Sequence, residues 1–544
     1  MKHYLSRLEA SVKAHWNDKA LCTWKGESFT FGQMAGYIEK FHILFAAAGV
    51  EKMDKVAICA KNSARWGISF LSVNTYGAVA VPILADFHPE SVNALVDHSE
   101  SIVLITDNDI WKKLDIDRMP ALRGVISAAD FSLLHCRDRK LQKAMDTLED
   151  LFMKKFPHGF SPDDVSYPAG NDGDLALINY TSGTTSAPKG VMLRYECISS
   201  NVEFGLKRIP VSPGDTLVSM LPLAHMYGMA FEFLYPLCGG ATVYFLGKTP
   251  TPSLLLGAMA SVRPYLIITV PLVMEKIFRN SIQPVISRPV MKALLHLPGI
   301  RRVILNKIRA KLLGAFGGNV KMIIMGGAPL NPEVEEWFRR IGLPYTVGYG
   351  MTECAPLLGY EDCGRFVARS CGKCVDRCEV RIDSDDPEHV PGEIQARGVN
   401  VMSGYYRNPE ATEAAFTPDG WLRTGDLGVI DSDGNIFIRG RSKNMILSSN
   451  GQNIYPEEVE AVVNSQPYVV ESVVVDRESR LVALTYIDRE KAESDGLDAA
   501  SVAAAVQAAS NKALPSYSRI SKVEIVDEPF EKTPKMSIRR FLYK

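Results

Sequence analysis

Residues 180–191 read Tyr-Thr-Ser-Gly-Thr-Thr-Ser-Ala-Pro-Lys-Gly-Val and follow an apolar run, 175–178, that is typical of a buried strand. A strand that leads into a loop of Gly, Ser and Thr exposes backbone N–H groups and hydroxyls together, and such a concavity binds anions such as phosphate. The stretch is not a P-loop, because Gly190 follows the lysine and Pro188, which has no N–H, precedes it. It predicts a phosphate loop of another kind, with a solvated turn as the alternative. The candidate ligands are Thr181, Ser182, Gly183, Thr184, Thr185 and Lys189.

Length and composition limit the class of protein. The chain has 544 residues, 46% of them hydrophobic, and a formal net charge of -1, so several domains with sizeable cores are expected and a nucleic-acid partner is not. The first residues, MKHYLSRLEA, lack the apolar segment of a signal peptide, and no apolar run reaches the roughly 18 residues of a membrane span. We therefore expect a cytoplasmic protein, with peripheral membrane contact left open.

Strand and helix patterns alternate along the first part of the chain. The expected strands are 55–60, 79–84, 102–106, 241–246, 265–270 and 320–325, and the expected helices are 66–78 and 89–99. This alternation predicts α/β subdomains with parallel sheets. The stretch 1–29 predicts one helix, and 156–174, rich in Pro, Asp and Gly, predicts a loop.

Two later changes of pattern indicate further units. Residues 371–438 have short strands and Asp-Gly turns, which predicts a small β-rich subdomain. Beyond it the chain predicts a compact α+β unit with a helix from Pro456, strands at 469–475 and 481–487, and a helix at 499–514. We expect an N-terminal domain, 1–440, and a small C-terminal domain, 441–544.

Five more motifs follow the phosphate loop. They are Leu-Pro-Leu-Ala-His-Met-Tyr-Gly at 221–228, Met-Gly-Gly-Ala-Pro-Leu at 325–330, Gly-Tyr-Gly-Met-Thr-Glu at 348–353, Trp-Leu-Arg-Thr-Gly-Asp at 421–426 and Arg-Gly-Arg-Ser-Lys at 439–443. In this order, they resemble the motifs of the adenylate-forming enzymes, which include acyl-CoA synthetases, luciferases and the adenylation domains of peptide synthetases. The resemblance covers nearly the whole chain. It implies two α/β subdomains and a small β-barrel, followed by a small mobile lid domain, with the site in the cleft between lid and body.

The resemblance also implies roles for individual residues. Gly327, Ala328 and Pro329 would form one wall of the adenine pocket. Tyr349 and Gly350 would lie against the base, and Asp426 and Arg441 would bind the ribose. Lys443 would be the hinge about which the small domain turns. His225 would lie near the reacting carboxylate oxygens, and the hydroxyl group of Thr352 would contact a phosphate. Glu353 would hold Mg²⁺. Amino-acid activators of this family carry an Asp just after the histidine, and here that position is Met226. Met226, Tyr227 and Met229 therefore suggest an apolar acyl pocket.

The C-terminal motif departs from the family pattern. The family places a catalytic lysine three residues after a proline, and here Ser537 stands at that position after Pro534. Lys535, two residues earlier, is the candidate replacement, and Lys532 is a weaker one. A solvated tail without a catalytic role is the alternative.

The implied reaction is ATP-dependent activation of a medium- or long-chain fatty acid, with Mg²⁺, followed by transfer to coenzyme A. The run at 221–228 and the region 307–330 look most like long-chain members. Two alternatives stay open: an acyl-AMP ligase that loads a carrier protein, and a non-catalytic nucleotide- or acyl-binding homologue. Acyl chain length and oligomeric state are not fixed by the sequence.

Four clustered cysteines allow a different kind of site. Cys371 and Cys374 have zinc-knuckle spacing, and Cys363 and Cys378 could complete four thiolates. The alternative is four reduced, packed thiols, which the lack of a second C-x-x-C pair favours.

Overall fold

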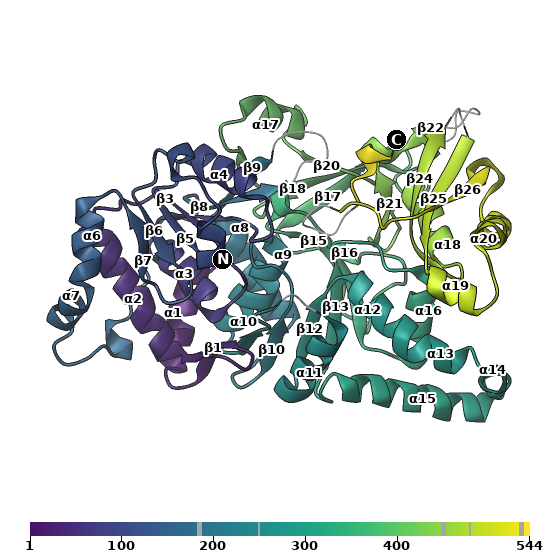
Figure 1. The fold of residues 1–544 in the computed structure, drawn as a ribbon, viewed down its shortest axis with the longest axis horizontal. Helices are drawn as coiled ribbons and strands as arrows, with labels where there is room; N and C mark the ends of the chain where they lie inside the picture. The colour runs from purple at the N-terminus through teal and green to yellow at the C-terminus, as the bar shows by residue number, and fades with distance from the viewer. Residues whose placement is uncertain (182–187, 249–250, 448–452, 478–479, 533–537, 544) are drawn as a thin grey trace.

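The computed structural model describes residues 1–181, 188–248, 251–447, 453–477, 480–532 and 538–543. Two large, mostly parallel sheets form the body, and a four-stranded antiparallel sheet leads from it to a small C-terminal unit at one end of the molecule (Figure 1). The predicted multidomain α/β and α+β architecture is confirmed.

The first large sheet contains β8 (Leu175–Thr181) and β9 (Lys189–Arg194), which flank the predicted phosphate loop. In spatial order its strands are β19 (Gly404–Tyr405), β9, β8, β4 (Val79–Pro82), β3 (Lys55–Cys59), β5 (Val103–Thr106), β6 (Gly124–Ser127) and β7 (Leu133–Cys136). The strands from β8 to β6 are parallel, whereas β9, β19 and β7 pair antiparallel at the edges. The structure thus confirms the expected strands at 55–60, 79–84 and 102–106, with slightly different ends.

The unit β3–α3–β4 shows why the sequence folds this way. The hydroxyl of Ser63 accepts a hydrogen bond from the backbone N–H of Trp66 and so caps α3 (Ala64–Tyr76). Gly77 ends the helix with φ +89°, a left-handed conformation that glycine adopts without a Cβ penalty. The chain can then turn directly into β4, which lies parallel to β3.

The second large sheet contains strands from the beginning of the chain and strands from its middle. In spatial order its strands are β16 (Lys373–Cys374), β15 (Leu357–Tyr360), β14 (Tyr345–Gly350), β13 (Met322–Gly326), β12 (Leu266–Thr269), β10 (Thr216–Ser219), β11 (Thr242–Phe245), β1 (Lys19–Thr23) and β2 (Ser28–Thr30). The prediction of a single helix in the stretch 1–29 is incomplete, because β1 and β2 follow that helix. β1 pairs with β11, which lies far along the chain, so no local pattern marks it.

Helices surround both sheets. They are α1 (Tyr4–Ala14), α2 (Phe31–Ala48), α3, α4 (Pro89–His98), α5 (Asn108–Trp111), α6 (Arg139–Asp146), α7 (Leu148–Lys155), α8 (Tyr195–Arg208), α9 (Met226–Gly228), α10 (Tyr235–Cys238), α11 (Pro252–Val262), α12 (Pro271–Ile277), α13 (Gln283–Ile286), α14 (Pro289–Leu295), α15 (Pro298–Ala315) and α16 (Pro332–Ile341). One continuous core serves both sheets. At its centre the ring of Trp66 stacks on Phe70, and Phe233 meets both rings edge-on.

The β-rich region is an open sheet. Its strands, all antiparallel, are β17 (Cys378–Asp383), β18 (Gly392–Gly398), β20 (Leu422–Ile430) and β21 (Ile436–Arg441). β17 and β21 are the two edges of this sheet, so the expected closed β-barrel is not confirmed. A short helix, α17 (Pro409–Ala415), interrupts the strands; Asn408 caps it and Pro409 occupies its first turn.

The C-terminal unit has its own core. Its elements are β22 (Ile446–Leu447), β23 (Asn453–Ile454), α18 (Pro456–Asn464), β24 (Val469–Arg477), β25 (Arg480–Ile487), α19 (Arg489–Ser494), α20 (Ala499–Ala513) and β26 (Lys522–Val526). β24, β25 and β26 form one sheet, and aliphatic side chains of α18 and α20 pack on it. The expected helices and strands of this region are confirmed.

Candidate functional site

A polar cluster lies at the carboxyl end of β14; Tyr349 and Asp426 are buried and Arg441 is exposed. The hydroxyl of Tyr349 donates a hydrogen bond to Oδ2 of Asp426 at 2.7 Å, and Nε of Arg441 lies 2.8 Å from Oδ1. Asp426 is 5% exposed; burial raises the pKa of its carboxyl group, and Arg441 opposes that shift. Each carboxylate oxygen keeps a second acceptor direction, so the cluster can bind a pair of neighbouring hydroxyl groups.

A second cluster lies just beyond the end of the same strand. Thr352 and Glu353 form a turn of 3-10 helix after β14, and the hydroxyl of Tyr405 donates a hydrogen bond to Oε1 of Glu353 at 3.0 Å. Nζ of Lys189 lies 4.8 Å from the centre of the Tyr405 ring. Tyr405 therefore connects Glu353 to Lys189 at the base of the predicted phosphate loop.

The stem of that loop is a hairpin. β8 and β9 pair antiparallel, with Thr181 opposite Lys189, so the two residues mark the base of the connecting segment. The predicted phosphate ligands Ser182, Gly183, Thr184 and Thr185 lie outside the described residues.

The predicted adenine wall is an exposed turn beside these clusters. Gly327, Ala328 and Pro329 follow β13, which pairs in parallel with β14 so that Gly326 lies opposite Gly348. Gly327 has φ +84°. A Cβ on Gly350 would lie 2.1 Å from the carbonyl oxygen of Pro356, so only glycine fits at the end of β14.

The residues predicted to line an acyl pocket are packed into the body. Met226 and Met229 are 1% and 0% exposed and belong to the core. The hydroxyl of Tyr227 donates to the backbone carbonyls of Thr269 and Ile324, at 3.4 and 3.2 Å, and so ties α9 to β12 and β13. His225 is the residue before α9, and its carbonyl accepts from the N–H of Met229.

Three side chains that the sequence does not single out, the half-buried Asn62 and the buried Asn179 and Glu232, hold the segment 219–225 in place. The amide of Asn62 donates to the carbonyl of Leu221 at 2.6 Å and accepts from the N–H of Leu223 at 3.0 Å. Asn179, on β8, donates to the carbonyl of Ala224 at 2.8 Å. These residues are far apart in sequence and carry no motif, so no sequence signal could have revealed them.

Glu232 is the third member of this clamp. Its carboxylate accepts from the hydroxyl of Ser219 and from the N–H groups of Met220 and Leu221, at 2.9–3.2 Å. It is 1% exposed, and burial raises its pKa to about 8 despite these donors. The strand β10 therefore passes into the His225 motif with its backbone groups satisfied.

The segment 533–537, which contains Lys535 and Ser537, lies outside the described residues. The C-terminal tail is packed against the C-terminal unit before and after this segment. Phe530 is buried and meets the ring of Tyr543 edge-on at 5.0 Å. Arg540 pairs with Glu460, whose pKa burial raises to about 7. Nζ of Lys532 lies 2.6 Å from Glu471. The described part of the tail is thus anchored at Phe530, Lys532 and Arg540, whereas Phe541 and Leu542 are exposed.

The four clustered cysteines are free thiols. Sγ of Cys374 donates to the carbonyl oxygen of Cys378, and Cys371 is buried. In the described part of the chain no three His, Cys, Asp or Glu side chains gather in a way that could hold a metal ion. The zinc-knuckle alternative therefore finds no support.

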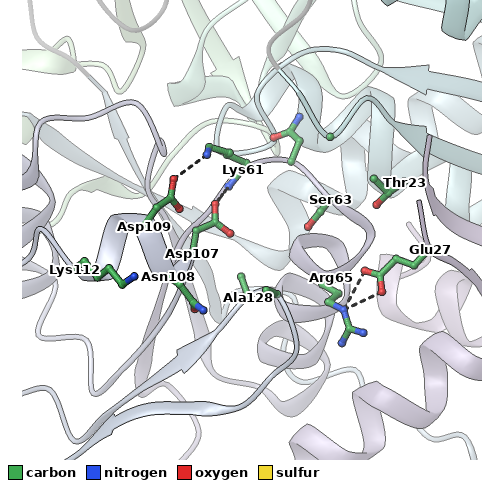
Figure 2. A pocket seen from close by; sticks show the side chains of 13 residues that line it. Thr23, Glu27, Lys61, Ser63, Arg65, Asp107, Asn108, Asp109, Lys112 and Ala128 are labelled. Carbon is green, nitrogen blue, oxygen red and sulfur yellow. Dashed lines mark hydrogen bonds and ion pairs between the residues drawn. The ribbon is translucent and has the colours of Figure 1, made fainter. Parts of the chain in front are cut away.

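A cavity of about 540 Å³ lies elsewhere, near the carboxyl ends of β3 and β5 (Figure 2). Two ion pairs lie in its lining: Lys61 with Asp109 at 3.0 Å, and Arg65 with Glu27 at 3.0 Å. None of the predicted site residues lines it. Asn62, at its edge, belongs to the clamp described above.

The chain matches two family models. Residues 8–406 match "AMP-binding enzyme", and residues 443–543 match "AMP-binding enzyme C-terminal domain". The chain therefore belongs to the AMP-binding enzyme family, the adenylate-forming enzymes that the motifs indicate.

Among curated relatives, the long-chain-fatty-acid–CoA ligase FadD15 of Mycobacterium bovis is 29% identical over 490 residues, which cover 85% of this chain and 78% of the relative. Long-chain-fatty-acid–CoA ligase 5 of Rattus norvegicus is 31% identical over 75% of this chain and 62% of its own length.

Two solved structures share the fold. The ATP-bound MatB of Rhodopseudomonas palustris superposes with a TM-score of 0.79 at 23% identity, covering 99% of this chain and 98% of its own. The anthranilate CoA ligase AuaEII with anthranoyl-AMP gives 0.81 at 20% identity, covering 100% and 96%. No described helix of the present chain is both long and apolar enough to span a membrane.

Proposed function

We propose that this protein is a fatty-acid–CoA ligase that forms AMP. In the first step an oxygen of the fatty-acid carboxylate attacks the α-phosphorus of ATP, and pyrophosphate leaves. In the second step the thiol of coenzyme A attacks the acyl carbon, loses its proton as the C–S bond forms, and displaces AMP. The first step is needed because a carboxylate has no good leaving group, whereas an acyl-AMP has one.

The observation that carries the proposal is the polar cluster of Tyr349, Asp426 and Arg441, at the end of the strand that leads into Glu353. A buried carboxylate with free acceptor directions suits the two hydroxyls of a ribose. In this proposal the phosphates of the same nucleotide would extend past Glu353, Tyr405 and Lys189, whose mutual contacts support a shared phosphate site. Membership in the AMP-binding family supports this assignment.

Glu353 fits the predicted Mg²⁺ site. Mg²⁺ is commonly held by one or two carboxylates together with substrate phosphates rather than by a protein cage. Glu353 supplies a carboxylate beside the loop stem, and no larger group of metal ligands is present in the residues that the structure describes. The ion would reduce the repulsion between the carboxylate and the α-phosphate.

We assign the reacting lysine to Lys535. Lys532 is held by Glu471, and Lys532 and Ile538 pair in an antiparallel bridge on either side of the segment that contains Lys535. A cation between these two anchored residues would neutralise the oxygens that gain charge in the transition state.

Lys443 is proposed as the hinge of the lid, domain 441–544. It is exposed in a turn of 3-10 helix, Ser442–Asn444, directly after β21, and the match to the C-terminal family model begins at this residue. Re-docking of one small domain would let it serve both half-reactions.

The acyl substrate is proposed to be a medium- or long-chain fatty acid, because both curated relatives are named long-chain-fatty-acid–CoA ligases. The test is AMP formation with ATP, Mg²⁺, coenzyme A and carboxylates from acetate to palmitate. We expect AMP and acyl-CoA with the longer acids. Acyl-AMP that accumulates without thioester would favour the carrier-protein ligase, and no AMP with any acid would contradict the proposal.

A further inference from the structure

The segment 276–332, which contains α14 and α15, is strongly and exclusively basic. It has no Asp or Glu, and its ten cationic residues are Lys276, Arg279, Arg288, Lys292, Arg301, Arg302, Lys307, Arg309, Lys311 and Lys321. The whole chain is nearly neutral, with a formal charge of -1, so this positive charge is a local feature.

Both helices are poorly buried. Leu295 is the only buried residue of α14, and Leu312 is the only one among the 18 residues of α15. α15 lies along one edge of the molecule, below the body and the C-terminal unit (Figure 1). Ile304, Leu305, Ile308 and Leu313 form the inner stripe of α15 and pack, partly buried, against the core, whereas the opposite side of the helix is exposed.

Aliphatic side chains project among the charges. Val290, Leu297, Ile300 and Val303 are 72%, 49%, 44% and 55% exposed. Val303, Lys307 and Lys311 follow one another at intervals of four residues, which places them in one row along α15. The same surface therefore combines an apolar ridge with long cationic side chains.

We propose that α14 and α15 form a docking surface for an anionic lipid bilayer. Helices that lie in a membrane interface have this composition, with aliphatic residues entering the acyl boundary and Lys and Arg reaching the headgroups. A nucleic acid would bind the cationic side chains but would make no use of the exposed aliphatic residues Val290, Leu297, Ile300 and Val303. The proposal rests on these two helices alone and does not depend on the ligase activity.

Vesicle co-sedimentation tests the proposal with the full-length protein. We expect it to bind vesicles that mix phosphatidylcholine with phosphatidylglycerol and not vesicles of phosphatidylcholine alone, and to release at about 0.5 M salt. Each basic residue near an anionic surface contributes a factor of about five in affinity. The double variant Arg301→Glu/Arg302→Glu should therefore bind at least about 30-fold more weakly. The variant Ile300→Ser/Val303→Ser should bind more weakly even at low salt.

Matched controls separate this surface from general charge. Arg139 and Lys140 are exposed on α6, far from α15 in Figure 1, and Arg139→Glu/Lys140→Glu changes the net charge equally. This control should bind as the wild type does. Equal loss in the control, or equal wild-type binding to both kinds of vesicle, would overturn the proposal. So would binding to heparin without binding to either vesicle.

Discussion

Asp426 is buried and is held between the hydroxyl group of Tyr349 and the guanidinium group of Arg441, which is itself exposed. Burial alone would favour its neutral form, and Arg441, 2.8 Å away, opposes that shift in the pKa. Tyr349 fixes the carboxylate from the other side. The side chain is therefore oriented before any ligand arrives, which lowers the entropy cost of binding hydroxyl groups.

Asp426→Asn should weaken ATP binding. The variant keeps an acceptor for Tyr349 but loses the charge that Arg441 faces and one acceptor for the ribose. Hydrogen bonds to charged groups contribute about 1.5–3 kcal/mol, so we expect a rise in the Kd for ATP of roughly 10- to 100-fold by calorimetry. Asp433→Asn, in an exposed turn, is the control. An unchanged Kd in Asp426→Asn would contradict the ribose assignment.

Glu232 should make stability depend on pH. Its folded pKa of about 8 lies above its ordinary value of 4.5, so the folded state binds the proton more tightly. The stabilisation is full below pH 4.5 and is lost as the pH rises toward 8, with a slope of at most about 1.4 kcal/mol per pH unit. Glu232→Gln cannot ionise, so its free energy of unfolding should rise relative to wild type between pH 5 and 8. Denaturant titrations of both proteins at these pH values measure the difference in the free energy of unfolding. A difference that does not change with pH would contradict the raised pKa of Glu232.

The segment 219–225 is held by side chains from three different parts of the chain. Its backbone is held by Asn62 from the loop after β3, by Asn179 from β8 and by Glu232 from the helical turns after α9. Residues from both large sheets thus meet at this segment. His225 is its last residue and follows the end of β10 in the chain.

Asn62→Ala should disturb that segment. It leaves the carbonyl of Leu221 and the N–H of Leu223 without their partner, which costs about 1–3 kcal/mol. We expect a lower thermal midpoint and, because the His225 segment shifts, a several-fold lower kcat/KM for the fatty acid. Asn108→Ala alters an exposed residue of the neighbouring cavity and should change neither (Figure 2). Equal behaviour of the two variants would show that the clamp has no functional role.

Local sequence patterns predict the helices and strands that are marked by the residues within and next to them. The strands at 55–60 and 102–106 are apolar runs between clear helix signals, and the structure has them as β3 and β5. The patterns do not predict β1, because its pairing with β11 is a long-range contact. They do predict the β-rich region, but the barrel that the family resemblance implies there is not confirmed, because the strands form an open sheet. The motif residues Tyr349, Asp426 and Arg441 do meet, whereas the clamp residues are single polar side chains that only the fold brings together.

The C-terminal unit is docked on the body in a defined orientation. The guanidinium of Arg279 donates to the carbonyls of Val469 and Asn464 at 2.9 and 2.8 Å, and Arg439 pairs with Glu458 at 3.5 Å. Interfaces between domains that move are typically polar, as these contacts are, which suits a lid that re-docks between half-reactions.

Arg279→Ala should loosen this docking. Loss of two hydrogen bonds from a charged donor should increase cleavage near Lys443 in limited proteolysis by several-fold, without a change in the body's stability. Arg288→Ala, an exposed residue on the neighbouring turn, is the matched control. Unchanged cleavage in Arg279→Ala would show that this contact does not hold the lid.

The most direct test of the whole account is pyrophosphate release with ATP, Mg²⁺ and a fatty acid. It compares the wild type with Lys535→Ala and Lys532→Ala, since Lys532 already pairs with Glu471. We predict release by the wild type and by Lys532→Ala, and a loss of at least about 100-fold in Lys535→Ala. Undiminished release by Lys535→Ala would contradict the assignment of the reacting lysine, and no release by the wild type with any acid would contradict the ligase itself.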